Sequence, residues 1–115
     1  MINPNRAPIT THVLNIATGK PAEGIEIMLE KQNGSNWAAI KTAKANADGR
    51  VDDLMAKGTK ADAGVYRMTF QTGAYFKNDT FYPRAEVIFE IKSTDQHYHV
   101  PLLVSPYGYS TYRGS

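Results

Sequence analysis

The residues of this chain best suited to acid–base chemistry are its three histidines. His12 lies in an alternating segment near the start, and His97 and His99 lie in a second such segment near the end. An imidazole with an ordinary pKa of about 6.5 can hold or deprotonate a water molecule at neutral pH. Two imidazoles brought to one place would therefore suit hydrolysis by an activated water.

The last residues add further groups that can bind a ligand or transfer protons. Tyr112, Arg113 and Ser115, with its free carboxylate, follow a Ser-Pro-Tyr-Gly sequence at residues 105–108. That sequence is typical of a tight turn, and the residues on both sides of it alternate as strands do. We therefore expect this terminus to form part of a site and not a frayed tail.

Short strands must position these residues. Apolar residues recur with a period of two between breaks of Gly, Asn, Asp and Pro, which is typical of an antiparallel β-sandwich. We expect strands at residues 10–16, 24–31, 38–44, 65–71, 85–91, 98–104 and 109–113, and a very short one after Arg50. A hairpin turn at 33–36 and a helix at 72–78, capped by Thr72, complete the pattern.

Strand alternation places apolar residues on the same outer faces as His12 and His99. These apolar residues are Leu14, Ile16, Pro101 and Leu103. An outer face this apolar needs a covering layer, and with no spare segment to supply it we expect a second subunit. If the two strands are neighbours, directly opposed residues have Cβ atoms about 4.5–5.5 Å apart, so the two histidines can approach each other.

Length and composition exclude several classes of protein. The 115 residues predict one domain, and the absence of cysteine excludes disulfides, a thiol nucleophile and thiolate–metal sites. A net charge of +2 without a run of Lys and Arg argues against nucleic acid as a partner. No stretch is apolar enough for a membrane span or a signal peptide, so we expect no membrane partner and a cytoplasmic location. A periplasmic location stays open if a signal peptide has been removed.

Three separated motifs resemble those of the 5-hydroxyisourate hydrolases, the transthyretin-like enzymes of urate breakdown. Residues 97–115 end in Tyr-Arg-Gly-Ser, residues 11–15 and 18–22 resemble the N-terminal motif, and Asp48-Gly49-Arg50 resembles the third. The resemblance spans about residues 11–115. It implies an all-β, transthyretin-like (prealbumin-like) antiparallel sandwich of seven to eight strands with one short helix, in which residues 1–9 are a lead segment and 10–115 the hydrolase domain.

The resemblance also implies a reaction, in which the ring of 5-hydroxyisourate opens at its amide-like bond to give 2-oxo-4-hydroxy-4-carboxy-5-ureidoimidazoline. His12 and His99 would bind and activate the attacking water, one of them as general base. Arg50 would anchor this purine-derived substrate or polarise the carbonyl under attack. No cofactor is implied, and His97 is expected to be a structural or supporting residue.

The same resemblance assigns roles to the terminus and to assembly. Tyr112 and Arg113 would contact the substrate ring, and Ser115 with its carboxylate would orient a histidine or relay a proton. The enzymatic relatives are homotetramers whose channel-side sheets form the sites, which agrees with the apolar outer faces. We therefore expect a homotetramer.

Other interpretations of the same residues stay open. A His-x-His pair with a third histidine elsewhere is compatible with a zinc site, although no carboxylate stands out as its orienting partner. Arg50 could be an ordinary turn charge, and Tyr112 could pack in a core or an interface. A transthyretin-like carrier would bind a small apolar ligand in the tetramer channel without turnover, but it would have other residues at the histidine and arginine positions. An adhesion or carbohydrate-binding sandwich has only Trp37 in its favour.

Overall fold

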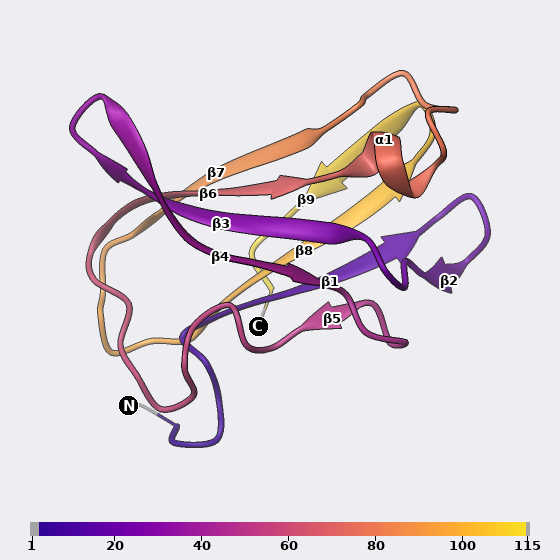
Figure 1. Cartoon of the computed structure of the whole chain (residues 1–115). Coiled ribbons are helices and arrows are strands. Elements are labelled where there is room, and N and C mark those ends of the chain that lie inside the picture. Colours follow the sequence, from indigo (N-terminus) through magenta and orange to yellow (C-terminus); the bar gives the residue numbers. More distant parts are fainter. Residues whose placement is uncertain (1–2, 115) are drawn as a thin grey trace.

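Residues 3–114 are described by a computed structural model, in which two β-sheets pack face to face with one short helix (Figure 1). The first sheet contains β1 (Ile9–Asn15), β2 (Lys20–Pro21), β5 (Arg50–Val51), β8 (Tyr98–Ser105) and β9 (Gly108–Thr111). The second contains β3 (Glu26–Asn33), β4 (Asn36–Lys44), β6 (Gly64–Phe70) and β7 (Ala85–Ile91). The helix α1 (Thr72–Tyr75) follows β6. The predicted all-β sandwich with one short helix is confirmed.

The order of the strands brings the two ends of the chain together. The first sheet runs β2-β1-β8-β9 with β5 also paired to β1, and the second runs β4-β3-β6-β7. All pairings are antiparallel except the one between β1 and β8, which is parallel. Figure 1 shows these two strands side by side, one purple and one yellow-orange, although paired residues such as Thr10 and His99 are 89 positions apart in the sequence.

The core consists of the inward-facing residues of both sheets. Its largest fully buried side chains include Ile9, Val13, Ile27, Leu29, Tyr66, Met68, Phe70, Leu102 and Val104. Burying a large apolar side chain contributes about 1.5–3 kcal/mol each. Alternation along β1 and β8 then directs the intervening residues, the histidines among them, to the outer face of the first sheet.

The helix is shorter than the sequence predicts and is capped differently. It ends at Tyr75, because Lys77 and Asn78 adopt positive φ angles of 54° and 65° that are incompatible with a right-handed helix. Thr72 lies in the first turn, and its hydroxyl donates to the carbonyl of Tyr82 and not to the helix N-terminus. The predicted cap is therefore wrong, because the hydroxyl has a partner in the following loop.

The outer face of the first sheet is apolar near the C-terminal ends of β1 and β8. Ile16 is 52% exposed, and Leu14 and Leu103 are half-buried. Pro101 differs from our expectation, since it is already buried within the single chain. None of the helices within residues 3–114 is long and apolar enough to span a membrane.

Candidate active site

A turn at residues 46–50 places Arg50 beside the first strand. The amides of Asp48 and Arg50 both donate to Asn46 Oδ1, at 2.9 and 3.0 Å. Gly49 has a φ of 75°, and a Cβ there would lie only 2.4 Å from the Val13 carbonyl oxygen. Only glycine fits this approach, which pairs β5 with β1 and places Arg50 opposite His12.

The two histidines expected to act together lie on one face but not directly opposite each other. In the parallel pairing of β1 with β8, His99 lies opposite Thr10 and His12 lies opposite Pro101. The spacing of directly opposed residues therefore does not apply to this pair, because the register offsets the histidines by two residues along the sheet. Each remains half-buried on the outer face.

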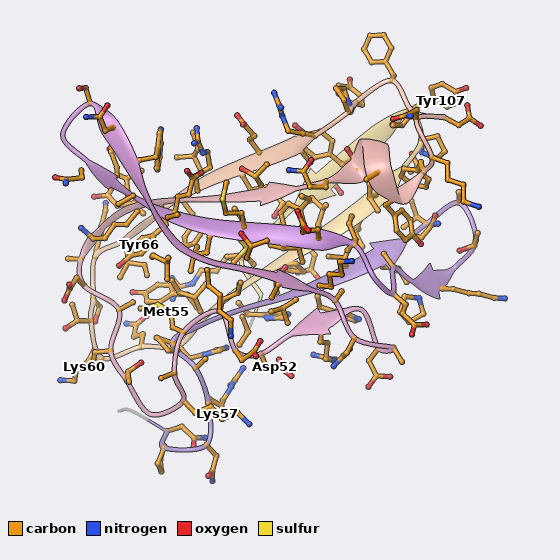
Figure 2. The ribbon with its side chains drawn as sticks, in the orientation of Figure 1. Asp52, Met55, Lys57, Lys60, Tyr66 and Tyr107 are labelled. Atoms are coloured by element: carbon orange, nitrogen blue, oxygen red, sulfur yellow. The ribbon has the colours of Figure 1, made fainter. Side chains whose placement is uncertain are left out.

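A polar cavity of about 310 Å³ opens beside His99. Its walls come from the segment before β1, from β1 itself, from β5 with the loop that follows it, and from β8. The lining residues are Asn5, Arg6, Ala7, Thr10, Arg50, Asp52, Lys57 and His99. Figure 2 shows Asp52 and Lys57 in the loop after β5. The cavity thus joins an imidazole to a guanidinium, a combination suited to activating water and stabilising an oxyanion.

Burial and nearby positive charge keep His99 neutral. Burial is the largest cause that lowers the pKa of His99 below its ordinary value of 6.5. The charges of His97, Arg50, His12 and Arg6 lower the pKa further. The lowered pKa favours the uncharged imidazole at neutral pH, which is the form that a general base requires.

The pKa of His97 is also lowered, although its neighbours act in opposite directions. Burial is again the main cause that lowers the pKa of His97, and the charge of Arg6 adds to the effect. The hydrogen bond to the Ala7 carbonyl and the carboxylate of Asp52 act in the opposite direction.

A series of hydrogen bonds links His99, on β8, to His97, which lies just before β8. His99 Nδ1 lies 2.8 Å from Thr10 Oγ1, and the same hydroxyl oxygen lies 3.1 Å from His97 Nε2. His97 Nδ1 then lies 2.7 Å from the Ala7 carbonyl oxygen. Thr10 is only 5% exposed, so water does not compete freely for its hydroxyl. Sequence reasoning missed Thr10, whose only signal was its position on the same face as His12, two residues earlier.

The C-terminal residues contact a different cavity. Tyr112 and Arg113 line an apolar cavity of about 260 Å³ between the end of the chain and β7, and His99 is the residue that both cavities share. Arg113 lies over the ring of Tyr98, 4.8 Å from its centroid, and Arg113 Nη2 donates to Gln96 Oε1 at 2.8 Å. The single chain thus brings Arg50 and His99 together in one cavity and Tyr112 and Arg113 together in the other.

His12 lines neither of the two cavities, although its charge acts on His99. Ser115 lies outside the described residues. Among residues 3–114, no group of three or more His, Cys, Asp or Glu side chains is arranged to hold a metal ion.

Gly114 packs against the His99 ring. Its amide donates to the His99 carbonyl at 2.8 Å, as an isolated bridge beyond the end of β9. A Cβ at this glycine would lie 2.5 Å from Cδ2 of the imidazole, closer than atoms can approach. The strand expected to run through residue 113 ends at Thr111, but the terminus returns to β8 at this bridge.

The chain matches one family over nearly its whole length. Residues 9–114 match the model of the HIUase/Transthyretin family. The chain is 46% identical over 110 residues to a 5-hydroxyisourate hydrolase of Salmonella dublin, and the alignment covers 93% of this chain and 80% of the relative. It is 44% identical over 114 residues to 5-hydroxyisourate hydrolase 2 of Rhizobium meliloti, covering 93% and 95% of the two chains.

Solved structures of two kinds share the fold. The structure of Klebsiella pneumoniae 5-hydroxyisourate hydrolase superposes with a TM-score of 0.81 at 36% identity, covering 93% of this chain and 97% of that one. Sea bream transthyretin in complex with thyroxine superposes with a TM-score of 0.86 at 30% identity, covering 94% and 95%. The fold and the sequence agree, and the chain belongs to the HIUase/Transthyretin family.

Proposed function

We propose that this protein hydrolyses 5-hydroxyisourate to 2-oxo-4-hydroxy-4-carboxy-5-ureidoimidazoline, a step of urate breakdown. The relatives named 5-hydroxyisourate hydrolase support this activity, and they come from several bacteria. The fold alone does not separate a hydrolase from a carrier, because transthyretin shares it. The observation that favours the enzyme is the polar cavity in which a neutral His99 lies with Arg50.

The geometry supports roles for His99 and Arg50, which share the polar cavity. His99 Nε2 takes a proton from water, whose oxygen attacks the carbonyl carbon of the amide-like ring bond. Arg50 binds the carbonyl oxygen and stabilises its negative charge in the transition state. The ring C–N bond then breaks, and the proton held by His99 passes to the departing nitrogen. His12 does not line the cavity, but it pairs with Arg50 and its charge acts on His99, and we assign it a role in holding the water.

We infer a homotetramer in which a second subunit covers the outer face of the first sheet. The exposed Ile16 and the half-buried Leu14 and Leu103 support such a cover. Tyr112 is 58% exposed and lies in the cavity away from Arg50. We assign substrate contact to Tyr112 and Arg113 and proton relay to Ser115. These roles would require the neighbouring subunit, which completes the site at this interface.

The direct test is to make 5-hydroxyisourate with urate oxidase and follow the decay of its absorbance. The protein should accelerate the decay catalytically, and Arg50→Lys should slow it, because an ammonium cannot reproduce the planar contact of a guanidinium. Lys41→Arg is a matched control, since Lys41 lies on β4, its ammonium binds Asp53, and neither residue lines the cavity. Decay at the buffer rate with a folded sample would overturn the proposal, and binding without turnover would favour a carrier.

A further inference from the structure

The hydrogen-bonded chain from Ala7 to His99 has a direction that is set at its far end. A carbonyl oxygen only accepts hydrogen bonds, so His97 must donate to Ala7 from Nδ1. A neutral imidazole has one N–H, and therefore His97 Nε2 is an acceptor. Its partner is Thr10 Oγ1, which must donate its only proton to His97.

The same reasoning fixes the proton on His99. Since the hydroxyl proton of Thr10 points to His97, its oxygen can only accept from the second histidine. His99 must then have its proton on Nδ1, the atom 2.8 Å from Thr10 Oγ1. Its Nε2 keeps a free lone pair, and within residues 3–114 no group forms a hydrogen bond with this nitrogen.

We propose that Thr10 and His97 are positioning residues, which hold His99 in the tautomer protonated at Nδ1 so that Nε2 is the base. The catalytic consequence rests on the hydrolase function proposed above, whereas the tautomer itself does not. A free imidazole prefers the opposite tautomer, with its proton on Nε2. In neutral histidines the partner of one nitrogen decides which nitrogen is protonated, and here that partner is the buried hydroxyl.

The direction of the hydrogen bonds through Thr10 would reverse if His97 gained a second proton. A charged His97 donates from Nε2 to Thr10, whose hydroxyl can then donate to His99 Nδ1 and favour the inactive tautomer. Burial and the charge of Arg6 oppose this protonation, whereas the Ala7 carbonyl and the Asp52 carboxylate favour it. The charges of His97, Arg50, His12 and Arg6 oppose protonation of His99.

The decisive measurement is the tautomer of His99 in the free protein, by long-range ¹H–¹⁵N NMR with ¹⁵N-labelled histidine. Thr10→Ser keeps the hydroxyl and should keep the Nδ1–H tautomer. Thr10→Val removes the hydroxyl but preserves the side-chain shape, and we expect the signal to shift toward the Nε2–H tautomer. His97→Phe removes the acceptor and should release the same constraint.

The matched control is Thr11→Val. Thr11 is the next residue on β1 and is fully buried, and its hydroxyl donates to the Val100 carbonyl at 2.6 Å on the core side. This variant loses a buried hydrogen bond as Thr10→Val does, but it leaves the histidines untouched. It should lower stability without changing the tautomer.

Kinetics connect the tautomer to the reaction. Thr10→Val should lower kcat about 10- to 100-fold, the loss expected when an orienting partner of a functional histidine is removed. KM should change little, and Thr10→Ser should retain most of the activity. An unchanged His99 tautomer in Thr10→Val would overturn the proposal, as would a changed tautomer with unchanged kcat or an equal loss in Thr11→Val. If the parent protein fails to hydrolyse 5-hydroxyisourate, the proposed function fails, and the NMR measurement still decides the tautomer.

Discussion

At the scale of single residues, the site depends on an uncharged imidazole at position 99. His99→Ala removes the proposed base, and we expect kcat to fall about 10²- to 10⁴-fold, the usual contribution of general acid–base catalysis. His12→Ala should lower kcat by a similar factor if His12 holds the water. Stopped-flow decay of 5-hydroxyisourate on folded variants measures both. A variant that keeps more than half of the activity would remove that histidine from the mechanism.

Gly114 offers a second residue-scale prediction, because it packs directly on the base. Gly114→Ala would place a methyl group 2.5 Å from His99 Cδ2, so the ring must move and activity should be largely lost. Gly108→Ala is the control, since a Cβ there has as its nearest neighbour Ser105 Oγ at 3.9 Å. Both variants should fold, as circular dichroism would show. Full activity in Gly114→Ala would mean that the terminus does not fix the ring.

At the scale of elements, the segment after β9 is separate from the core. None of residues 112–114 belongs to the buried core cluster, but Gly114 hydrogen-bonds β8 beside the base. Removing residues 112–115 should therefore abolish hydrolysis while leaving the melting temperature within a few degrees of the parent. Calorimetry and the decay assay test the two halves of this expectation. An active truncated chain would show that the terminus is dispensable.

The longer strands were predictable from sequence because alternation is a local property, whereas the two-residue strand β2 was not predicted. The faces of His12 and His99 followed from alternation, and the short strand expected after Arg50 is found as β5, which begins at Arg50. The register between β1 and β8 was not predictable, because it is set by packing between residues 89 positions apart. Without that register, Thr10 had no visible connection to His97 or His99, and the hydrogen-bonded chain could not be found.

At the scale of the whole molecule, assembly and activity should be lost together. Leu14→Glu places a charge on the outer face of the first sheet, where a second subunit would bury it without a partner. We expect a smaller particle by light scattering and a parallel loss of hydrolysis. Ile40→Glu is the control, since Ile40 is 36% exposed on β4 of the other sheet. A fully active monomer would show that one chain builds the complete site.

The stability of the molecule should also depend on pH. The pKa values of His97 and His99 are lowered in the folded protein, mainly by burial, from an ordinary 6.5. As the pH falls below that ordinary value, the unfolded chain binds protons that the folded chain does not, so the free energy of unfolding decreases. Urea denaturation should give a lower midpoint at pH 5 than at pH 7. The dependence should be weaker in His97→Gln/His99→Gln, and an equal dependence would place its origin elsewhere.

The parallel pairing of β1 with β8 has a consequence for how the protein folds. Thr10 and His99 meet only after the chain between them, 89 positions long, has closed into a loop. Contacts between such distant residues slow folding, because the entropy of closing the loop is lost before the contacts can form. During synthesis, β1 leaves the ribosome long before β8 does, and the base cannot be assembled until nearly the whole chain is available. An incomplete chain therefore has no premature activity, and synthesis to the end is itself a condition for catalysis.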